Sequence, residues 1–211
     1  DPNRIYVALI GQAKNNDNGF IGIYRSNNAG DTWTLPNPPT GGPYTASHPN
    51  LASYQPDGSG FHQGFYNFGI AASHTNADQL LLGFLSLWKS TDGATTFLPL
   101  GGYVGSPNNY IHPDIQELEI NGTDIWFTSD GGINYSTDFV ANHEARNNGI
   151  NSSDFWGFSS GWNEDVLVGG RYHNGNTAWY QNYPAGNFLG LGGGEASTGY
   201  VNPGQNRNTY F

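Results

Sequence analysis

The sequence predicts an all-β fold of short antiparallel strands, and three observations lead to this prediction. The chain has 211 residues with 31 Gly and 12 Pro, a composition rich in turns. Charged residues make up 11% and aromatic residues 15%, which excludes an intrinsically disordered chain because disorder needs high charge and few aromatic side chains. Short apolar runs recur about every ten residues between Gly, Asn, Asp and Pro, as antiparallel strands joined by tight turns require.

The expected strands follow one another with turns between them. In chain order they are residues 4–10, 66–73, 80–87, 114–120, 125–129, 155–160 and 166–170. Residues 77–89 are apolar enough to be mistaken for a buried helix, since short apolar runs are ambiguous. This run aligns with the other repeats of the chain, and the alignment favours a strand.

A serine-centred motif repeats along the chain. The segment IYRSNNAGDTW at residues 23–33 aligns with LWKSTDGATTF at residues 87–97, and a third, incomplete copy INYSTD begins at Ile133. A fourth copy, expected near Gln181, has lost the motif. Repeats of about 40 to 50 residues with four strands each are typical of the blades of a β-propeller.

The spacing of the motif locates an insertion. Ser26, Ser90 and Ser136 are 64 and 46 residues apart, and the excess of 18 in the first interval falls in the Pro-, Gly- and His-rich residues 37–63. We expect these residues to form a long loop inserted between two repeats.

We therefore expect one domain over residues 1–211, an incomplete β-propeller segment with about four blades. The blades are expected at residues 1–36, 64–101, 112–142 and 154–190, and the next one is expected to start in residues 193–211. Because unpaired strand edges expose polar backbone and apolar surface, we expect remaining blades of the same polypeptide, or a partner chain, to cover the two ends.

Charge and composition exclude several classes of partner. The chain has 17 acidic and 7 basic residues and a net charge of −10, so it lacks the cations that bind nucleic acid. It contains no Cys, which excludes disulfides and thiolate sites. No apolar run reaches the length of about 18 residues that a membrane span needs.

The serine-centred motif resembles the Asp box, S-x-D-x-G-x-T-W, of bacterial neuraminidase-type (BNR) repeats. The matching residues are Ser26, Asn28, Gly30 and Trp33 in the first copy, and Ser90, Asp92, Thr96 and Phe97 in the second. We expect a structural role: Ser and Asp or Asn side chains bind backbone N–H groups in the turn, Gly permits positive φ, and the aromatic ring is buried between sheets.

Two longer segments, residues 64–97 and 110–136, resemble exported bacterial β-propellers of the sortilin and xyloglucanase type. The resemblance rests on YNFGIA at residue 66, LWKSTDG at residue 87, IHPDIQELE at residue 111 and SDGGI at residue 129. It implies a secreted or cell-surface protein. The Gly-rich segments at residues 169–175 and 192–195 differ from those of the relatives, which favours a noncatalytic recognition or scaffold domain for glycan or protein over an enzyme.

The rival interpretation is a glycoside hydrolase that acts on a β-glucan such as xyloglucan. Such an enzyme needs two carboxyl groups across the mouth of the propeller channel. The candidates are Asp114, Asp130, Asp154 and Glu195. The alternative for these aspartates is a structural hydrogen bond to their own turns. A third interpretation is an export cargo of a secretion or surface assembly.

Aromatic side chains on loops are suited to stacking on sugar rings, and polar residues beside them add hydrogen bonds. The candidate ligand-binding residues are His112, Arg171, His173, Tyr44, Tyr54, Tyr103 and Tyr110. No cofactor is expected; a Ca²⁺ ion held by His112, Asp114 and Asp130 is the alternative, because oxygen ligands suit that ion.

Overall fold

The computed structural model consists of β-strands and turns. It describes residues 1–11, 19–36, 44–45, 49–59, 61–104, 110–150, 152, 154–162, 165–171, 174–180, 184, 187–192 and 199–202, and the backbone of 205–210. These residues form sixteen strands and no helix, so the all-β prediction is confirmed. In the described part of the chain there is accordingly no helix that could cross a membrane.

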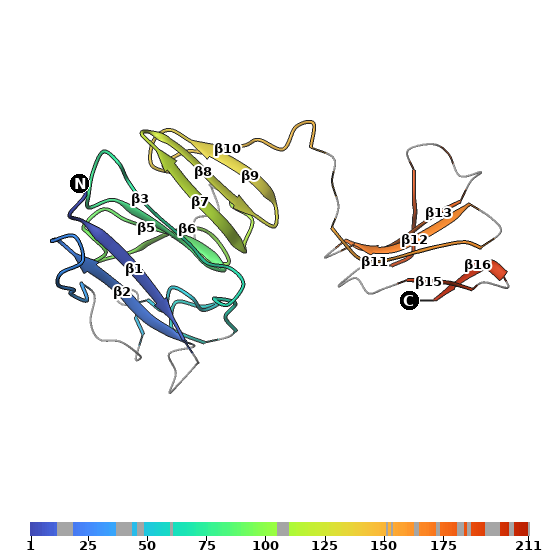
Figure 1. The fold of residues 1–211 in the computed structure, drawn as a ribbon, viewed down its shortest axis with the longest axis horizontal. Coiled ribbons are helices and arrows are strands. Elements are labelled where there is room, and N and C mark those ends of the chain that lie inside the picture. The colour runs from blue at the N-terminus through green and yellow to red at the C-terminus, as the bar shows by residue number, and fades with distance from the viewer. Residues whose placement is uncertain are drawn as a thin grey trace. The chain divides into compact units, whose positions relative to one another are not determined.

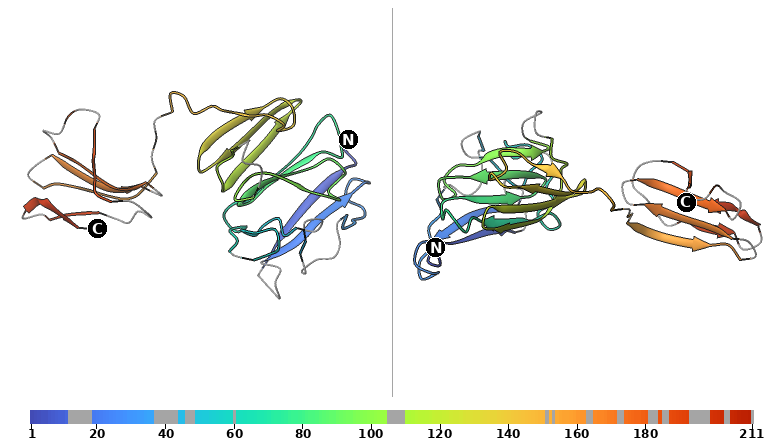
Figure 2. Two further views of the ribbon diagram at one scale, coloured as in Figure 1. Left: turned by 180° about the vertical axis from the view of Figure 1, so that it is seen from behind. Right: turned by 90° about the horizontal axis from the view of Figure 1, so that it is seen from above.

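The chain divides into two compact units, Asp1–Asn148 and Gly149–Phe211 (Figure 1; Figure 2). The first unit contains a two-stranded and two four-stranded antiparallel sheets. Their strands are β1 (Ile5–Ile10) and β2 (Phe20–Ser26); β3 (Gly69–Ala72), β4 (Leu80–Gly83), β5 (Ser86–Ser90) and β6 (Leu98–Gly102); and β7 (Ile115–Asn121), β8 (Asp124–Ser129), β9 (Gly132–Ser136) and β10 (Glu144–Ala145).

In each four-stranded sheet the strands pair in chain order, β3-β4-β5-β6 and β7-β8-β9-β10. This meander of four antiparallel strands is the arrangement of a propeller blade. Residues 77–89, the segment whose apolar run could be mistaken for a helix, contain β4 and most of β5. The predicted blade-type sheets are confirmed.

The sheet β3–β6 lies between the other two sheets of the first unit, and strand β4 shows why its sequence is apolar throughout. Leu80 and Leu82 pack into a core with Ala8 and Ile23 of the β1–β2 sheet. Leu81, which points to the opposite face, packs with residues of the β7–β10 sheet such as Ile115 and Phe127. A strand buried on both faces reads as a continuous apolar run rather than an alternating one.

The second unit contains one four-stranded and one two-stranded antiparallel sheet. Its strands are β11 (Phe155–Ser160), β12 (Val166–Arg171), β13 (Gly175–Tyr180), β14 (Leu189–Gly190), β15 (Tyr200–Asn202) and β16 (Gln205–Tyr210). Val166, Val168 and Ala178 are buried, with Val201 of β15 packed against them.

Candidate functional site

The three serine-centred motifs of the first unit form the same turn, at one end of the sheets that we call the turn end. Ser26 Oγ accepts hydrogen bonds from the Asn28 and Gly30 N–H groups at 3.2 and 2.9 Å. Ser90 and Ser136 accept the equivalent pair at 3.0 to 3.4 Å. The third copy, incomplete in sequence, therefore has the full geometry in the structure.

A carboxylate or amide oxygen completes each turn. Asp92 Oδ1 accepts from the Thr96 N–H at 2.9 Å, and Asp138 Oδ1 accepts from the Asn142 N–H at the same distance. The backbone and side-chain N–H groups of Asn142 lower the pKa of Asp138 to about 2. Each turn has two successive residues with positive φ, such as Ala29 and Gly30, so the predicted structural role of Gly30 agrees with the geometry.

The aromatic residues of the first two motifs differ in burial. Phe97 is 5% exposed and belongs to the core between the first two sheets, as predicted. Trp33 is 42% exposed, so the prediction that it is buried is wrong. The reason is that the β1–β2 sheet packs into that core by one face only, while its side chains Leu9 and Ile21 are also exposed.

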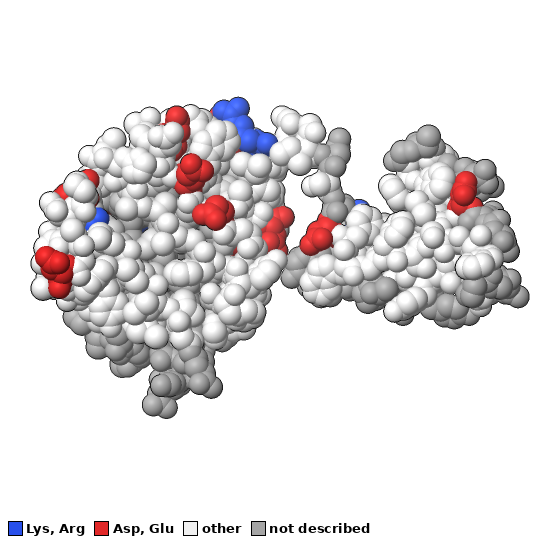
Figure 3. Space-filling view, in the orientation of Figure 1, with Lys and Arg blue, Asp and Glu red and all other residues white. Residues whose placement is uncertain are grey.

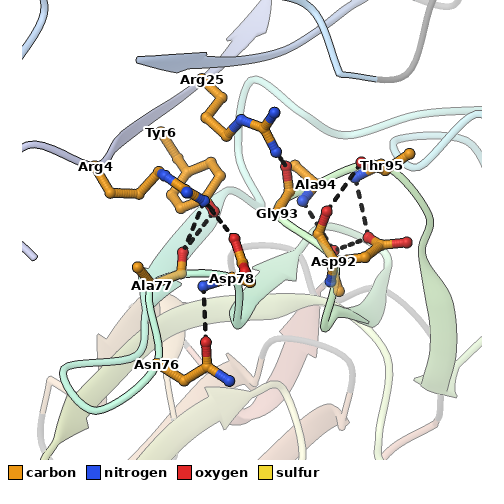
Figure 4. Close-up of polar contacts among 11 residues, drawn as sticks. Arg4, Tyr6, Arg25, Asn76, Ala77, Asp78, Asp92, Gly93, Ala94 and Thr95 are labelled. Atoms are coloured by element: carbon orange, nitrogen blue, oxygen red, sulfur yellow. Dashed lines mark hydrogen bonds and ion pairs between the residues drawn. The ribbon is translucent and has the colours of Figure 1, made fainter. Parts of the chain in front are cut away.

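Two arginines join the first two sheets at the turn end (Figure 4). Arg25 of β2 donates to the Gly93 carbonyl at 2.8 Å, and Arg4 pairs with Asp78 at 2.5 Å. Tyr6 OH donates to the Ala77 carbonyl at 2.6 Å. These contacts connect neighbouring sheets, which indicates a structural role for the turn end.

Most of the predicted site residues lie at the opposite end, where β4, β6 and β8 finish and β7 begins; we call this the loop end. Asp114 precedes β7 and donates its N–H to the Leu85 carbonyl at 3.1 Å, and Ile115 N–H donates to Phe84 at 2.8 Å. Asp114 is 8% exposed and has a φ of +67°. A non-glycine residue in this strained conformation is often found at a functional site.

Asp130 lies on the turn between β8 and β9 and is exposed. Gln116 Nε2 donates to Asp130 Oδ1 at 3.0 Å. The register of β7 against β8 shifts between Ile115 and Glu117, so Gln116 is the extra residue of a β-bulge. Bulges re-aim side chains and are frequent beside active sites.

The two carboxylates share their surroundings with Tyr103. Burial raises the pKa of the Tyr103 phenol, and the charges of Asp114, Tyr54 and Asp130 raise it further. The sign follows from electrostatics, because nearby negative charge disfavours the tyrosinate form. The charges of Asp114 and Asp130 therefore both reach the Tyr103 phenol.

Tyr54, Phe61 and Tyr103 form an aromatic cluster at the loop end. The ring centroid of Tyr54 is 5.3 Å from that of Phe61 and 4.7 Å from that of Tyr103. Phe61 and Tyr103 are 48% and 42% exposed, so the cluster presents ring surface to solvent. Tyr110 and His112 lie nearby, with ring centroids 6.4 Å apart.

Of the remaining predicted residues, one is buried, two belong to the second unit and two lie outside the described residues. Tyr44 is buried at 8% exposure, so its ring offers no surface for stacking. Asp154 and Arg171 belong to the second unit, where Arg171 donates to the Asn174 carbonyl at 3.0 Å. His173 and Glu195 lie outside the described residues. His112, Asp114 and Asp130 are described but do not form a metal-holding group, so the geometry gives the calcium alternative no support.

Among the described residues, the carboxylates of Asp114 and Asp130 give the loop end negative charge. The cationic side chains among the described residues make their contacts elsewhere: Arg4 and Arg25 at the turn end, Lys89 with the Phe139 carbonyl, Arg146 with Glu144, and Arg171 in the second unit. The face in Figure 3 is largely uncharged with scattered acidic side chains. An anionic ligand would meet repulsion at Asp114 and Asp130.

Two contributors to the site, Gln116 and Asn147, carry no motif that would single them out as functional. Gln116 lies two residues after Asp114 in the segment IHPDIQELE. Asn147 forms hydrogen bonds to the backbone of the turn that carries Asp130. It lies 14 to 16 residues after the turn residues that it binds. Phe61 could be expected from its place among the loop aromatics.

Comparison with known proteins finds similarity among solved structures. No protein-family model matches the chain, and no curated protein is similar to it. Similar structures include an ancestral GH74 enzyme (15% identity, TM-score 0.33, covering 98% of this chain and 32% of that one). The GH74 xyloglucanase from Xanthomonas campestris has 13% identity and a TM-score of 0.41, with 99% and 33% of the two chains covered.

A third similar structure is YCF48 bound to a D1 peptide, with 12% identity, a TM-score of 0.39 and coverage of 96% of this chain and 63% of that one. The chain thus spans about a third of the two GH74 proteins and less than two thirds of YCF48. At these identities the similarity concerns the fold alone.

Proposed function

We propose that the protein is a recognition domain of a secreted or cell-surface bacterial β-propeller, and that it binds carbohydrate at the loop end of the first unit. The observation that carries the proposal is the partly exposed cluster Tyr54, Phe61 and Tyr103 at the loop end, where the charges of Asp114 and Asp130 raise the pKa of Tyr103. The apolar face of a sugar ring stacks on aromatic rings, and its hydroxyl groups donate hydrogen bonds to carboxylates.

The charges at the site favour a neutral glycan. The charges of Asp114 and Asp130 both raise the pKa of Tyr103. The cationic side chains among the described residues contact other groups, away from these carboxylates. A sugar that carries a carboxylate would add like charge, and like charges in contact are unfavourable. Neutral β-glucans are therefore the first ligands to test.

A glycoside hydrolase is the second candidate function. It is favoured by the presence of two carboxylates, Asp114 and Asp130, whose charges act on the same phenol, that of Tyr103. Hydrolysis requires one carboxyl group as acid and the other as base or nucleophile. A protein ligand at the same aromatic surface, or a role as export cargo, is the remaining alternative, since aromatic residues are also enriched at protein interfaces.

Titration calorimetry with soluble neutral β-glucans tests the proposal. The wild-type protein is expected to bind at least one of them and to release no reducing ends. Tyr103→Ala and Asp130→Asn are expected to weaken binding. Trp126→Ala is the matched control, because Trp126 is 40% exposed on β8 and its ring packs at an angle of 44° against that of Tyr135, which is not part of the aromatic cluster.

Three outcomes contradict the proposal in different ways. Turnover that disappears in Asp114→Asn or Asp130→Asn would assign the hydrolase. Binding that is lost equally in Trp126→Ala would place the ligand elsewhere. No binding of any neutral glycan would remove the carbohydrate proposal.

A further inference from the structure

The turn that carries Asp130 is fixed from outside by a single side chain. Asn147 Nδ2 donates to the Gly131 carbonyl at 2.9 Å, and Asn147 Oδ1 accepts from the Ile133 N–H at 2.8 Å. One amide group therefore binds the backbone on both sides of Gly132. Asn147 follows β10, so its two hydrogen bonds connect the start of β9 to the segment after β10.

Close packing on both glycines shows that this turn has a defined position. A Cβ atom on Gly132 would overlap the Asn147 side chain, and Gly132 has a φ of +107°. A Cβ atom on Gly131 would overlap the His112 side chain. The backbone of the turn is flanked by Asn147 and His112, and the turn carries the exposed side chain of Asp130.

A second contact acts on the carboxylate itself. Gln116, the bulge residue of β7, donates to Asp130 Oδ1 at 3.0 Å. The Asn147 amide thus holds the backbone of the turn, and the Gln116 amide holds the Asp130 side chain. Neither Gln116 nor Asn147 lies in the turn.

We propose that Gln116 and Asn147 are positioning residues that hold the Asp130 carboxylate at the loop end for contact with the ligand. The inference rests on the proposed function and names the residues that set up its polar contact. Fixing a carboxylate before binding avoids part of the entropy cost of ordering it in the complex. A site supported in this way keeps its geometry without the ligand.

The test uses Gln116→Met and Asn147→Ala, which remove the amides without adding charge. Each variant is expected to weaken glucan binding about tenfold. This is the size of effect expected when a charged group loses one hydrogen bond or one residue that holds it in place. The matched control is Asn142→Ala, which removes the 2.7 Å bond from Asn142 Nδ2 to Asp138 at the turn end of the same sheet. The control should bind as the wild type does.

A second readout needs no ligand. The pKa of Tyr103 is followed by NMR of the protein with ¹³C-labelled tyrosine, with Tyr103→Phe to assign the signal. Asp130→Asn is expected to lower the pKa of Tyr103, because it removes one of the negative charges that raise it. Gln116→Met and Asn147→Ala should shift it in the same direction if Asp130 moves away from Tyr103.

The outcomes separate the two proposals. If the wild type binds no glucan but both variants lower the pKa of Tyr103, the proposed function fails and the positioning role is supported. If Asp130→Asn weakens binding while both variants bind and titrate as the wild type, the positioning role is overturned. Loss of affinity with an unchanged Tyr103 pKa also overturns it. Should Asn147→Ala fail to fold, Gln116→Met, which removes a contact between two side chains, decides the question.

Discussion

The Arg25 guanidinium donates a hydrogen bond to the Gly93 carbonyl at 2.8 Å, although the two residues belong to different sheets and are 68 positions apart. Gly93 lies in the second serine-centred turn and has a φ of +70°. The contact shows that a turn defined by local hydrogen bonds also joins one sheet to the next. Four predictions follow from contacts of this kind at the two ends of the first unit.

Gly93→Ala is expected to destabilise the protein by about 2 kcal/mol, because it adds backbone strain at positive φ and a Cβ atom that overlaps the Arg25 guanidinium. Chemical denaturation measures the free energy of unfolding. Gly122→Ala is the control, since Gly122 has a φ of +63° but no atom within 4 Å of the added Cβ. Its expected cost is about 1 kcal/mol, that of the strain alone. Equal costs for the two variants would show that the contact with Arg25 is unimportant.

Ser136→Ala is expected to destabilise the protein as much as Ser90→Ala, by about 1 to 3 kcal/mol, because each substitution leaves two N–H groups of a turn without their acceptor. Ser90 and Ser136 are both buried, at 1% and 3% exposure. The comparison tests whether the third turn is equivalent to the second despite its incomplete sequence. A neutral Ser136→Ala variant would mean that the third turn does not depend on the serine.

The stability that Asp138 provides should depend on pH. Its pKa in the folded protein is about 2, below the value of about 4 in an unfolded chain, so the folded state favours the carboxylate. This contribution is complete above pH 4 and is lost as the pH falls from 4 toward 2. The difference in unfolding free energy between the wild type and Asp138→Asn is expected to shrink over that range. A difference that stays constant from pH 6 to pH 3 would contradict the hydrogen-bonded carboxylate.

The sequence was sufficient for features that depend on local pattern and insufficient for those that depend on packing. The repeat around Ser26 and Ser90 predicted the turns, because their hydrogen bonds connect residues within six positions. The exposure of Trp33 depends on which face of the β1–β2 sheet is covered, and no local pattern contains that information. The sequence alone could not indicate that Asn147 would hold the Asp130 turn, because the sheet pairing brings them together.

In the candidate site, too, the sequence predicted which residue types are present but not which of them are exposed. The IHPDIQELE and SDGGI segments predicted Asp114 and Asp130 as candidates, and in the structure the charges of both raise the pKa of Tyr103. Tyr44 has the same residue type and lies in the same inserted loop as Tyr54, yet it is buried. Residue type predicts which side chains can stack on a sugar, whereas exposure depends on how the loop packs.

Stacking on Tyr103 should depend on its ring more than on its hydroxyl group. Tyr103→Phe keeps the ring contact with Tyr54, whose centroid is 4.7 Å away, and is expected to bind glucan within about threefold of the wild type. Tyr103→Ala removes the ring and is expected to weaken binding about tenfold or more, as the loss of a stacking contact does. Both affinities are measured by titration calorimetry at neutral pH, with thermal melting to show that the variants are folded. If Tyr103→Phe and Tyr103→Ala lose affinity equally, the hydroxyl group makes the main contact and the stacking surface proposed here is wrong.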